Sequence, residues 1–145
     1  MSGARRALLA TFVVGTVDQI FMLPLRTRYS MLRHLSLSGK VVIIDEVHAY
    51  STYTNGYLHS TLTWLAWYGV PVILLSATLP HEQKIALLET YQRGLRVSRP
   101  DEIAISTQYP SVTVLDNDGV HEFAVPLSPD QLQISVDLID DDEST

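Results

Sequence analysis

The stretch of sequence that decides the fold is Val41-Val42-Ile43-Ile44-Asp45-Glu46-Val47-His48. Its four consecutive apolar residues are typical of a strand that is buried on both faces, as in a parallel sheet covered by helices. Two adjacent carboxylates follow, and desolvated carboxylates are costly unless they are paired or bound to a metal. Because ligands bind beyond the carboxyl ends of the strands in open α/β sheets, we expect Asp45 and Glu46 to lie in such a site.

An Asp-Glu-x-His sequence at the end of a buried strand has the pattern of a Walker B motif. An aspartate there can hold Mg²⁺ through its water shell, and the neighbouring glutamate can orient and deprotonate a water that attacks a phosphate. The pattern therefore favours nucleoside triphosphate hydrolysis coupled to nucleic acid. The alternative interpretation is a buried strand that merely ends in solvated acidic residues.

A second apolar run, residues 70–75, ends in a Ser-Ala-Thr sequence. Between the two runs, residues 53–68 carry leucines at helical spacing, and Gly69 follows as an expected C-terminal cap. A strand, a helix and a second strand form a right-handed crossover, which brings both strand ends to one edge of the sheet. We therefore expect Ser76 and Thr78 to lie beside the two carboxylates, although Thr78 could instead cap the helix that follows it.

A third apolar run, residues 8–14, is predicted to be another parallel strand, and Gly15 follows it. Thr16 and Gln19 have the spacing of a capping box, which predicts a helix that starts at Thr16. A helix N-terminus preceded by glycine presents backbone N–H groups that can bind a phosphate. In a nucleic-acid motor, this segment would contact the backbone of the bound strand.

Three segments together resemble the CRISPR-associated helicase-nucleases of type I interference systems, which are superfamily 2 helicases. The segments are Val14 to Gln19, Leu32 to Tyr50 and Leu74 to Pro80. The resemblance implies ATP-driven translocation on single-stranded DNA that feeds a metal-dependent nuclease domain. It also implies ATP and Mg²⁺ as cofactors and a CRISPR surveillance (Cascade-like) complex as a partner. Ser51 departs from the family pattern, which commonly has an acidic residue at this position.

The resemblance also implies roles for the site residues. Asp45 would bind Mg²⁺ through water, and Glu46 would activate the attacking water. His48 would link the site to the second helicase lobe, whereas Ser76 and Thr78 would couple the nucleotide state to the grip on DNA. The DNA contacts would come from Gly15, Thr16, Asp18, Gln19 and Arg33.

Parts of a complete motor are absent from the 145 residues. The sequence has no Gly-x-x-x-x-Gly-Lys-Ser/Thr phosphate loop, no arginine after Arg99 that could act as a finger, and no His-Asp pair of the kind the family's nuclease needs. We therefore expect a piece of a longer ATP-dependent DNA helicase, a hydrolase acting on ATP, that is inactive by itself. The alternative is a non-catalytic remnant or binding module with a RecA-like fold.

The charge of the chain is unevenly distributed. The net charge is +5 over residues 1–44, zero over 45–100 and −11 over 101–145. The basic first third fits contact with a DNA backbone, or a solvated loop, and the acidic last third argues against DNA contact there. The chain has no cysteine, which agrees with a cytoplasmic location. No run approaches the ~20 apolar residues of a membrane helix.

The predicted fold class is α/β: a partial RecA-like (P-loop NTPase) lobe with a parallel sheet flanked by helices, and a C-terminal β-hairpin extension. We expect residues 1–100 to form the C-terminal part of the first helicase lobe, and residues 101–145 to form a β-rich acidic extension toward the second lobe. The other expected elements are a helix ended or kinked by Pro24, a helical turn near 30–35, a helix at 80–93, a hairpin of 111–115 with 120–125, and a strand within 131–139.

Overall fold

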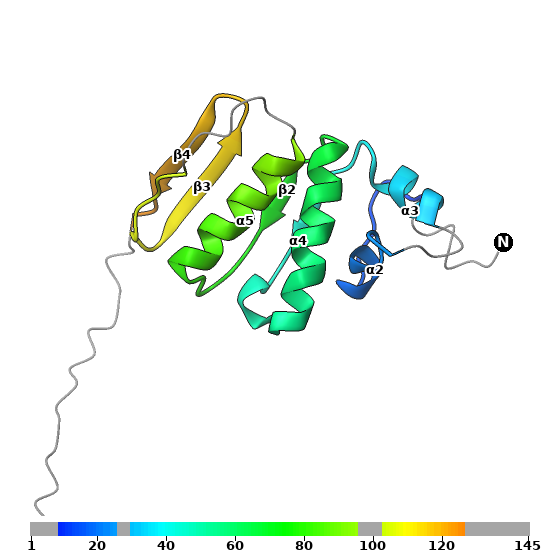
Figure 1. The fold of residues 1–145 in the computed structure, drawn as a ribbon, viewed down its shortest axis with the longest axis horizontal. Coiled ribbons are helices and arrows are strands. Elements are labelled where there is room, and N and C mark those ends of the chain that lie inside the picture. The colour runs from blue at the N-terminus through cyan, green and yellow to red at the C-terminus, as the bar shows by residue number, and fades with distance from the viewer. Residues whose placement is uncertain (1–8, 26–29, 96–102, 127–145) are drawn as a thin grey trace, which may run out of the picture.

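The computed structural model describes residues 9–25, 30–95 and 103–126 (Figure 1). The strand expected within 131–139 lies outside the described residues. The elements in chain order are α2 (Asp18–Phe21), α3 (Ser30–Leu37), β1 (Val42–Ile44), the 3-10 helix η1 (Val47–Ala49), α4 (Thr52–Trp67), β2 (Val72–Leu74), α5 (His81–Gly94), β3 (Ser111–Asp116) and β4 (Gly119–Ala124).

Strands β1 and β2 pair in parallel, with Val42 opposite Val72 and Ile44 opposite Leu74. Helix α4 connects them, so the predicted strand–helix–strand crossover is confirmed. Val42 and Ile44 are buried against the helices, whereas Ile43 on the opposite face is 62% exposed. The expectation of a strand buried on both faces is therefore wrong for the described part of the chain, where α4 and α5 lie over one face of the sheet (Figure 1).

The third strand, expected at 8–14, does not form within residues 9–14. The Phe12 side chain is 90% exposed, and Val14 is fully exposed. A strand is stable only when a neighbour satisfies its N–H and C=O groups. Among the described residues β1 pairs only with β2, so this segment has no strand to pair with. The predicted order of three adjacent parallel strands thus holds for two of them.

Helix α2 is shorter than the capping-box pattern predicts. It begins at Asp18, and its N-cap residue is Val17 without a side-chain hydrogen bond. Thr16 contributes its backbone carbonyl instead, which accepts the Gln19 N–H at 3.1 Å. The capping box starting at Thr16 is therefore wrong, while the helix does end before Pro24 as expected.

Helix α4 is capped at both ends. The Ser51 hydroxyl accepts the Thr54 N–H at 3.3 Å, which satisfies one of the unpaired donors of the first turn. At the other end Gly69 has φ of +63°, its N–H donates to Ala66, and the Val70 N–H donates to Leu65, each at 2.9 Å. These two bonds form a Schellman motif, which confirms the predicted glycine cap.

The hydrophobic core lies between α2, α4 and the sheet. It is formed by apolar side chains that are less than a tenth exposed: Phe21, Leu23, Val42, Ile44, Val47, Leu58, Leu62, Leu65, Val70 and Leu87. The three buried leucines of α4 recur at helical spacing, as the sequence indicated. Because Val47 follows β1 directly and is fully buried, the core also fixes the backbone that leaves the strand.

Helices α4 and α5 approach each other closely at Gly94. A Cβ atom at this position would lie 2.6 Å from the Ala66 Cβ and 2.7 Å from the Thr63 carbonyl oxygen. A polar contact fixes the same pair of helices, since His59 Nδ1 lies 2.7 Å from Thr90 Oγ1. Burial lowers the pKa of His59, and the nearby Arg93 charge lowers it further, so the imidazole is held neutral.

The hairpin of β3 and β4 is antiparallel and has a two-residue turn between Asp116 and Gly119, as the Asp-Asn-Asp-Gly signal predicts. Lys84 of α5 pairs with Glu122 of β4 at 2.9 Å and ties the hairpin to the helix. Hydrogen bonds from Lys84 and from the Ser106 N–H lower the pKa of Glu122 to about 2. Whether residues 101–145 form a separate domain remains a prediction.

Replacing Gly94 by alanine should destabilise the chain by about 1–3 kcal/mol, because the new methyl group overlaps the facing helix backbone. The matched control is Gly56→Ala, in the same pair of helices, where a Cβ meets nothing within 4 Å. That change should stabilise the chain by about 0.5–1 kcal/mol, because alanine restricts the unfolded backbone. Urea denaturation of the 145-residue chain measures both. Equal effects of the two substitutions would contradict the close helix contact.

The Lys84–Glu122 ion pair predicts an acid-sensitive hairpin. A carboxylate whose pKa is lowered on folding from 4.5 to about 2 contributes stability above pH 4.5 and loses it as the pH falls toward 2. Glu122→Gln should therefore lower the free energy of unfolding by about 1 kcal/mol at pH 7, and this difference should vanish near pH 2. A difference between the two proteins that stays constant from pH 7 to pH 2 would rule out this role for Glu122.

Candidate active site

The candidate site lies at the edge of the sheet where β1 and β2 end. Asp45 and Glu46 follow β1 directly, and Ser76 comes two residues after β2. Backbone pairing continues past the strands, because Leu75 N–H donates to Ile44 at 2.9 Å. Val47 N–H then donates to the Leu75 carbonyl at 3.1 Å, so the two connections leave the sheet together.

His48 joins the two connections. Its Nδ1 lies 3.1 Å from the Ser76 hydroxyl, and its Nε2 lies 3.2 Å from a Glu46 carboxylate oxygen. The imidazole thus bridges the acidic sequence after β1 and the Ser-Ala-Thr sequence after β2. The structure brings together three residues that the sequence assigns to one site, while their catalytic and coupling roles stay predictions.

Glu46 occupies an uncommon backbone conformation. Its φ of 55° and ψ of 41° lie in the left-handed region, which costs a non-glycine residue about 1–2 kcal/mol. The Glu46 N–H donates to the Asp45 carboxylate at 2.9 Å, and the Asp45 carbonyl accepts the Tyr50 hydroxyl at 3.0 Å. Strain of this kind persists only when surrounding contacts hold it, and it is common at active sites.

The two carboxylates face solvent. Asp45 is exposed, and the Glu46 side chain is 65% exposed. Among the described residues, no group of three His, Cys, Asp or Glu side chains is placed to hold a metal ion directly. An accessible aspartate with one oxygen already accepting an N–H fits a hydrated cation bound through its water shell, rather than a cage of protein ligands.

Thr78 lies on the rim of an open cavity of ≈ 600 Å³ beside His48. The cavity is lined by His48, Ala77, Thr78, Leu79, Pro80, Gln83 and Tyr109. Helix α5 has Pro80 as its N-cap residue and no side-chain cap, so the alternative in which Thr78 caps that helix is wrong. Thr78 is exposed at this rim, and its coupling role stays a prediction.

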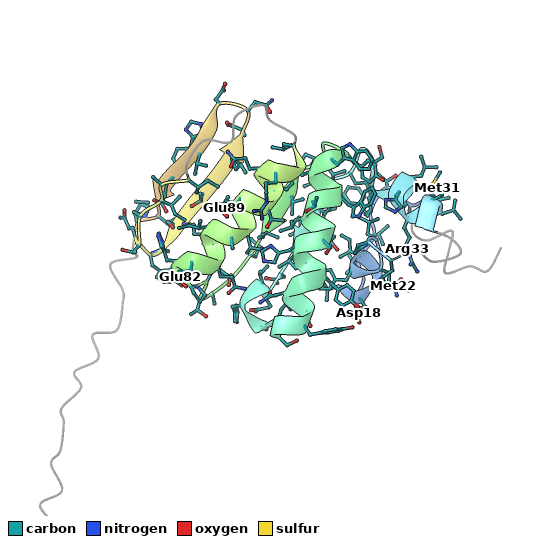
Figure 2. All side chains as sticks on the ribbon, in the orientation of Figure 1. Asp18, Met22, Met31, Arg33, Glu82 and Glu89 are labelled. Carbon is teal, nitrogen blue, oxygen red and sulfur yellow. The ribbon has the colours of Figure 1, made fainter. Side chains whose placement is uncertain are left out.

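The residues assigned to DNA lie apart from the cavity. Thr16, Asp18 and Gln19 are exposed at the start of α2, next to Gly15. Figure 2 shows Asp18 and Arg33 in the region of α2 and α3, on the side of α4 away from the hairpin. The Arg33 carbonyl accepts the Ser36 hydroxyl at 2.8 Å within α3. The other arginines of the basic first third, at 5, 6, 26 and 28, lie outside the described residues.

Tyr50 is a site residue that sequence reasoning missed. Its hydroxyl donates to the Asp45 carbonyl, and its ring packs edge-on against Phe21 of α2 with ring centroids 5.6 Å apart. In the sequence Tyr50 was only part of the motif that carried the family resemblance. The contact with Asp45 spans five residues across an irregular turn, and the contact with Phe21 depends on the tertiary fold, so no helical or strand periodicity could have revealed them.

The parallel strand pair, the acidic sequence after β1 and the His48 bridge to Ser76 define a segment of a RecA-like helicase lobe. No family model matches the sequence. The CRISPR-associated nuclease/helicase Cas3 of Streptococcus thermophilus is 40% identical over 147 residues, which cover 98% of this chain and 16% of that protein. The CRISPR-associated endonuclease/helicase Cas3 of Escherichia coli K12 is 38% identical over 128 residues, or 88% of this chain and 14% of that protein.

Solved structures give the same result. The structure of T. fusca Cas3 with AMPPNP superposes with a TM-score of 0.77 at 35% identity, over 89% of this chain and 16% of that one. Structures of T. fusca Cas3 with ADP and with ATP each give a TM-score of 0.74 at 38% identity, over 83% of this chain and 14% of the other. A structure described as a CRISPR RNA-guided surveillance complex, pre-nicking, gives 0.73 at 38% identity, over 83% of this chain and 15% of that one.

This chain is therefore homologous to one segment of the Cas3 nuclease/helicases, and it spans less than a fifth of the length of the relatives it matches. The resemblance read from its motifs and the predicted α/β fold class are both confirmed. In the described part of the chain, no helix is long and apolar enough to cross a membrane.

The left-handed conformation of Glu46 predicts an unequal response to two substitutions that remove the same carboxylate. Glu46→Gly should give a chain more stable than Glu46→Ala by about 1 kcal/mol, because only glycine adopts this conformation without steric cost. Urea denaturation of the two variants measures the difference. An alanine variant as stable as the glycine variant would contradict the strained turn.

Proposed function

We propose that this chain provides the Walker B and Ser-Ala-Thr motifs of the first RecA-like lobe of an ATP-dependent single-stranded DNA helicase or translocase in type I CRISPR interference. The observation that carries the proposal is the contact chain from Glu46 through His48 to Ser76 at the end of two parallel strands. The homologous proteins are named nuclease/helicases, and relatives have been solved with ADP, AMPPNP and ATP.

In this proposal Asp45 and Glu46 perform the hydrolytic chemistry. Asp45 holds the magnesium ion through water, and that ion would neutralise charge on the phosphates when bound. Glu46 accepts a proton from the attacking water, because its carboxylate is exposed and held close to His48. The strained turn follows β1 directly, and the Glu46 carboxylate lies 3.2 Å from His48 Nε2.

His48, Ser76 and Thr78 are proposed to couple hydrolysis to the grip on DNA. A change in the charge or position of Glu46 reaches Ser76 through one imidazole, over two contacts of about 3 Å. Ser76 and Thr78 belong to the connection between β2 and α5, so a shift there moves the start of α5 and the rim of the cavity.

DNA contact is proposed at Gly15, Thr16, Asp18, Gln19 and Arg33. The support is that the segment before α2 is exposed and that Figure 2 shows Arg33 in the same region as Asp18. A nearby guanidinium is needed, since Asp18 itself repels phosphate and polar N–H groups alone bind it weakly.

The wider setting of the proposal follows from the relatives. One of them has been solved in a CRISPR RNA-guided surveillance complex, which supports a Cascade-like partner. We place residues 1–100 in the first lobe and residues 101–145 in an acidic extension toward the second lobe, in a cytoplasmic protein. The competing proposal is a non-catalytic binding module with a RecA-like fold, and the missing phosphate loop fits both proposals.

The purified 145-residue chain should show no ATPase activity above background, with or without single-stranded DNA. Phosphoryl transfer needs a phosphate cradle and an arginine finger, and loss of the finger alone costs about 10³–10⁵ in rate in related enzymes. DNA-stimulated ATP hydrolysis by the chain alone would contradict the prediction that it is inactive by itself. A malachite-green phosphate assay measures the rate.

A chimeric protein distinguishes the two proposals, an ATP-driven motor and a non-catalytic binding module. We would replace the matching 147 residues of the Streptococcus thermophilus relative with this chain. The chimera should hydrolyse ATP, and Glu46→Gln should abolish hydrolysis while leaving ATP binding in place, because it removes the base and keeps the fold. Glu89→Gln, an exposed carboxylate of α5, is the control and should keep full activity. A folded chimera with no ATPase activity would favour the binding module.

A further inference from the structure

Tyr50 connects two parts of the molecule that the proposed function treats separately. Its hydroxyl donates to the Asp45 carbonyl at 3.0 Å, at the first residue after β1. Its ring meets Phe21 edge to face, with centroids 5.6 Å apart and planes at 81°. Phe21 is 6% exposed and is the last residue of α2, the helix that follows the segment assigned to DNA.

We propose that Phe21 and Tyr50 form a mechanical link between α2 and the Asp45–Glu46 turn, and that Tyr50 acts as a positioning residue through which DNA at α2 adjusts the hydrolytic carboxylates. The inference rests on the proposed function for its DNA and ATP steps. Its structural part, the connection of α2 to the turn, stands on the contacts alone.

The turn is suited to receive such a signal because it is strained. Glu46 has a left-handed backbone, which costs a non-glycine residue about 1–2 kcal/mol and must be offset by the contacts around it. The peptide group between Asp45 and Glu46 is held on both sides: its carbonyl accepts the Tyr50 hydroxyl, and its N–H donates to the Asp45 carboxylate. A displacement of Tyr50 therefore loosens one of the two hydrogen bonds that hold this peptide group in place.

The Tyr50 hydroxyl donates to a backbone carbonyl, which has no hydrogen to give, so this contact depends on the phenol O–H alone. The contact with Phe21 uses the ring and the contact with Asp45 uses the hydroxyl, so the two halves of the link can be removed one at a time.

Helix α2 is short and is held in the core at its C-terminal end. It has four residues and no side-chain cap, Phe21 is its one buried residue, and the buried Leu23 follows two residues later. A displacement of the exposed residues before α2 would therefore shift Phe21. Through the contact between Phe21 and Tyr50, it would also shift the Asp45–Glu46 turn. The side chains of Tyr53 and Tyr57, which pair at 2.8 Å on α4, provide a matched hydroxyl contact outside this path.

The structural part is tested on the 145-residue chain by amide hydrogen exchange. Tyr50→Phe should raise exchange at Glu46 and Ala49 about 3- to 10-fold, as expected for loss of one hydrogen bond, and leave the amides of α5 unchanged. Phe21→Leu should raise exchange at the same two amides. In the double variant the effects should be less than additive, because both act through one ring. Tyr53→Phe, the control, should leave Glu46 and Ala49 unchanged.

The functional part is tested in the Streptococcus thermophilus chimera by the ratio of DNA-stimulated to basal ATPase rate. Tyr50→Phe and Phe21→Leu should each lower this ratio about 3- to 10-fold, whereas Tyr53→Phe should leave it unchanged. A residue that only stabilised the fold would change both rates together and keep the ratio. An unchanged ratio overturns the coupling role even if the exchange data show the structural link.

The two proposals fail in different ways. If the parent chimera lacks ATPase activity, the proposed function is lost, and the exchange experiment still decides whether α2 is linked to the turn. If the parent chimera is active and DNA-stimulated but Phe21→Leu leaves Glu46 exchange and the ratio unchanged, the link is overturned and the proposed function stands. Additive effects of Tyr50→Phe and Phe21→Leu on exchange would likewise overturn a shared path.

Discussion

The parallel pairing of β1 with β2 is the constraint on which the rest of the structure depends. Parallel neighbours cannot be joined by a tight turn, so the chain must return through a crossover, and α4 is that crossover. The same geometry delivers the ends of both strands to one edge. For this reason the edge brings together Asp45, Glu46 and Ser76, although residues 45 and 76 are far apart in the sequence.

The helices that cover the sheet determine the positions of the residues at this edge. The buried leucines of α4 fix its height over β1 and β2, and the absence of a side chain at Gly94 lets α5 approach the backbone of α4. The connection that carries Ser76 and Thr78 is held between β2 and α5. The position of Ser76 relative to His48 therefore depends on packing between helices as well as on the 3.1 Å contact between the two side chains.

Much of the fold could be read from the sequence, because its elements are specified locally. The β1 and β2 runs, the leucine spacing of α4, the glycine cap at Gly69 and the Asp-Gly hairpin turn each depend on a few neighbouring residues. Residues 9–14 have equally apolar side chains but form no strand, because a strand also needs a partner that local sequence cannot supply. The capping box at Thr16 failed for a related reason: the spacing was right, but the helix began two residues later.

The candidate site divides in the same way between what sequence shows and what only tertiary structure shows. The chemistry-bearing residues Asp45, Glu46, His48 and Ser76 were identifiable because their types and spacing follow from where strands end. The contacts that give the site its geometry were not identifiable. The bridging role of His48 requires the two strand ends to be side by side, and the role of Tyr50 requires α2 to pack against the turn.

A strained acidic turn has a physical advantage at such a site. Contacts from Asp45 and Tyr50 hold the peptide group that precedes Glu46, and His48 contacts the Glu46 carboxylate. These contacts end on different parts of the fold: the end of β1, helix α2 through Phe21, and the connection to α5 through Ser76. The backbone and the carboxylate of one residue are thus held from three separate parts of the fold. Under the proposed function, such a carboxylate would be positioned only when all three parts are in place, without any large movement of the sheet.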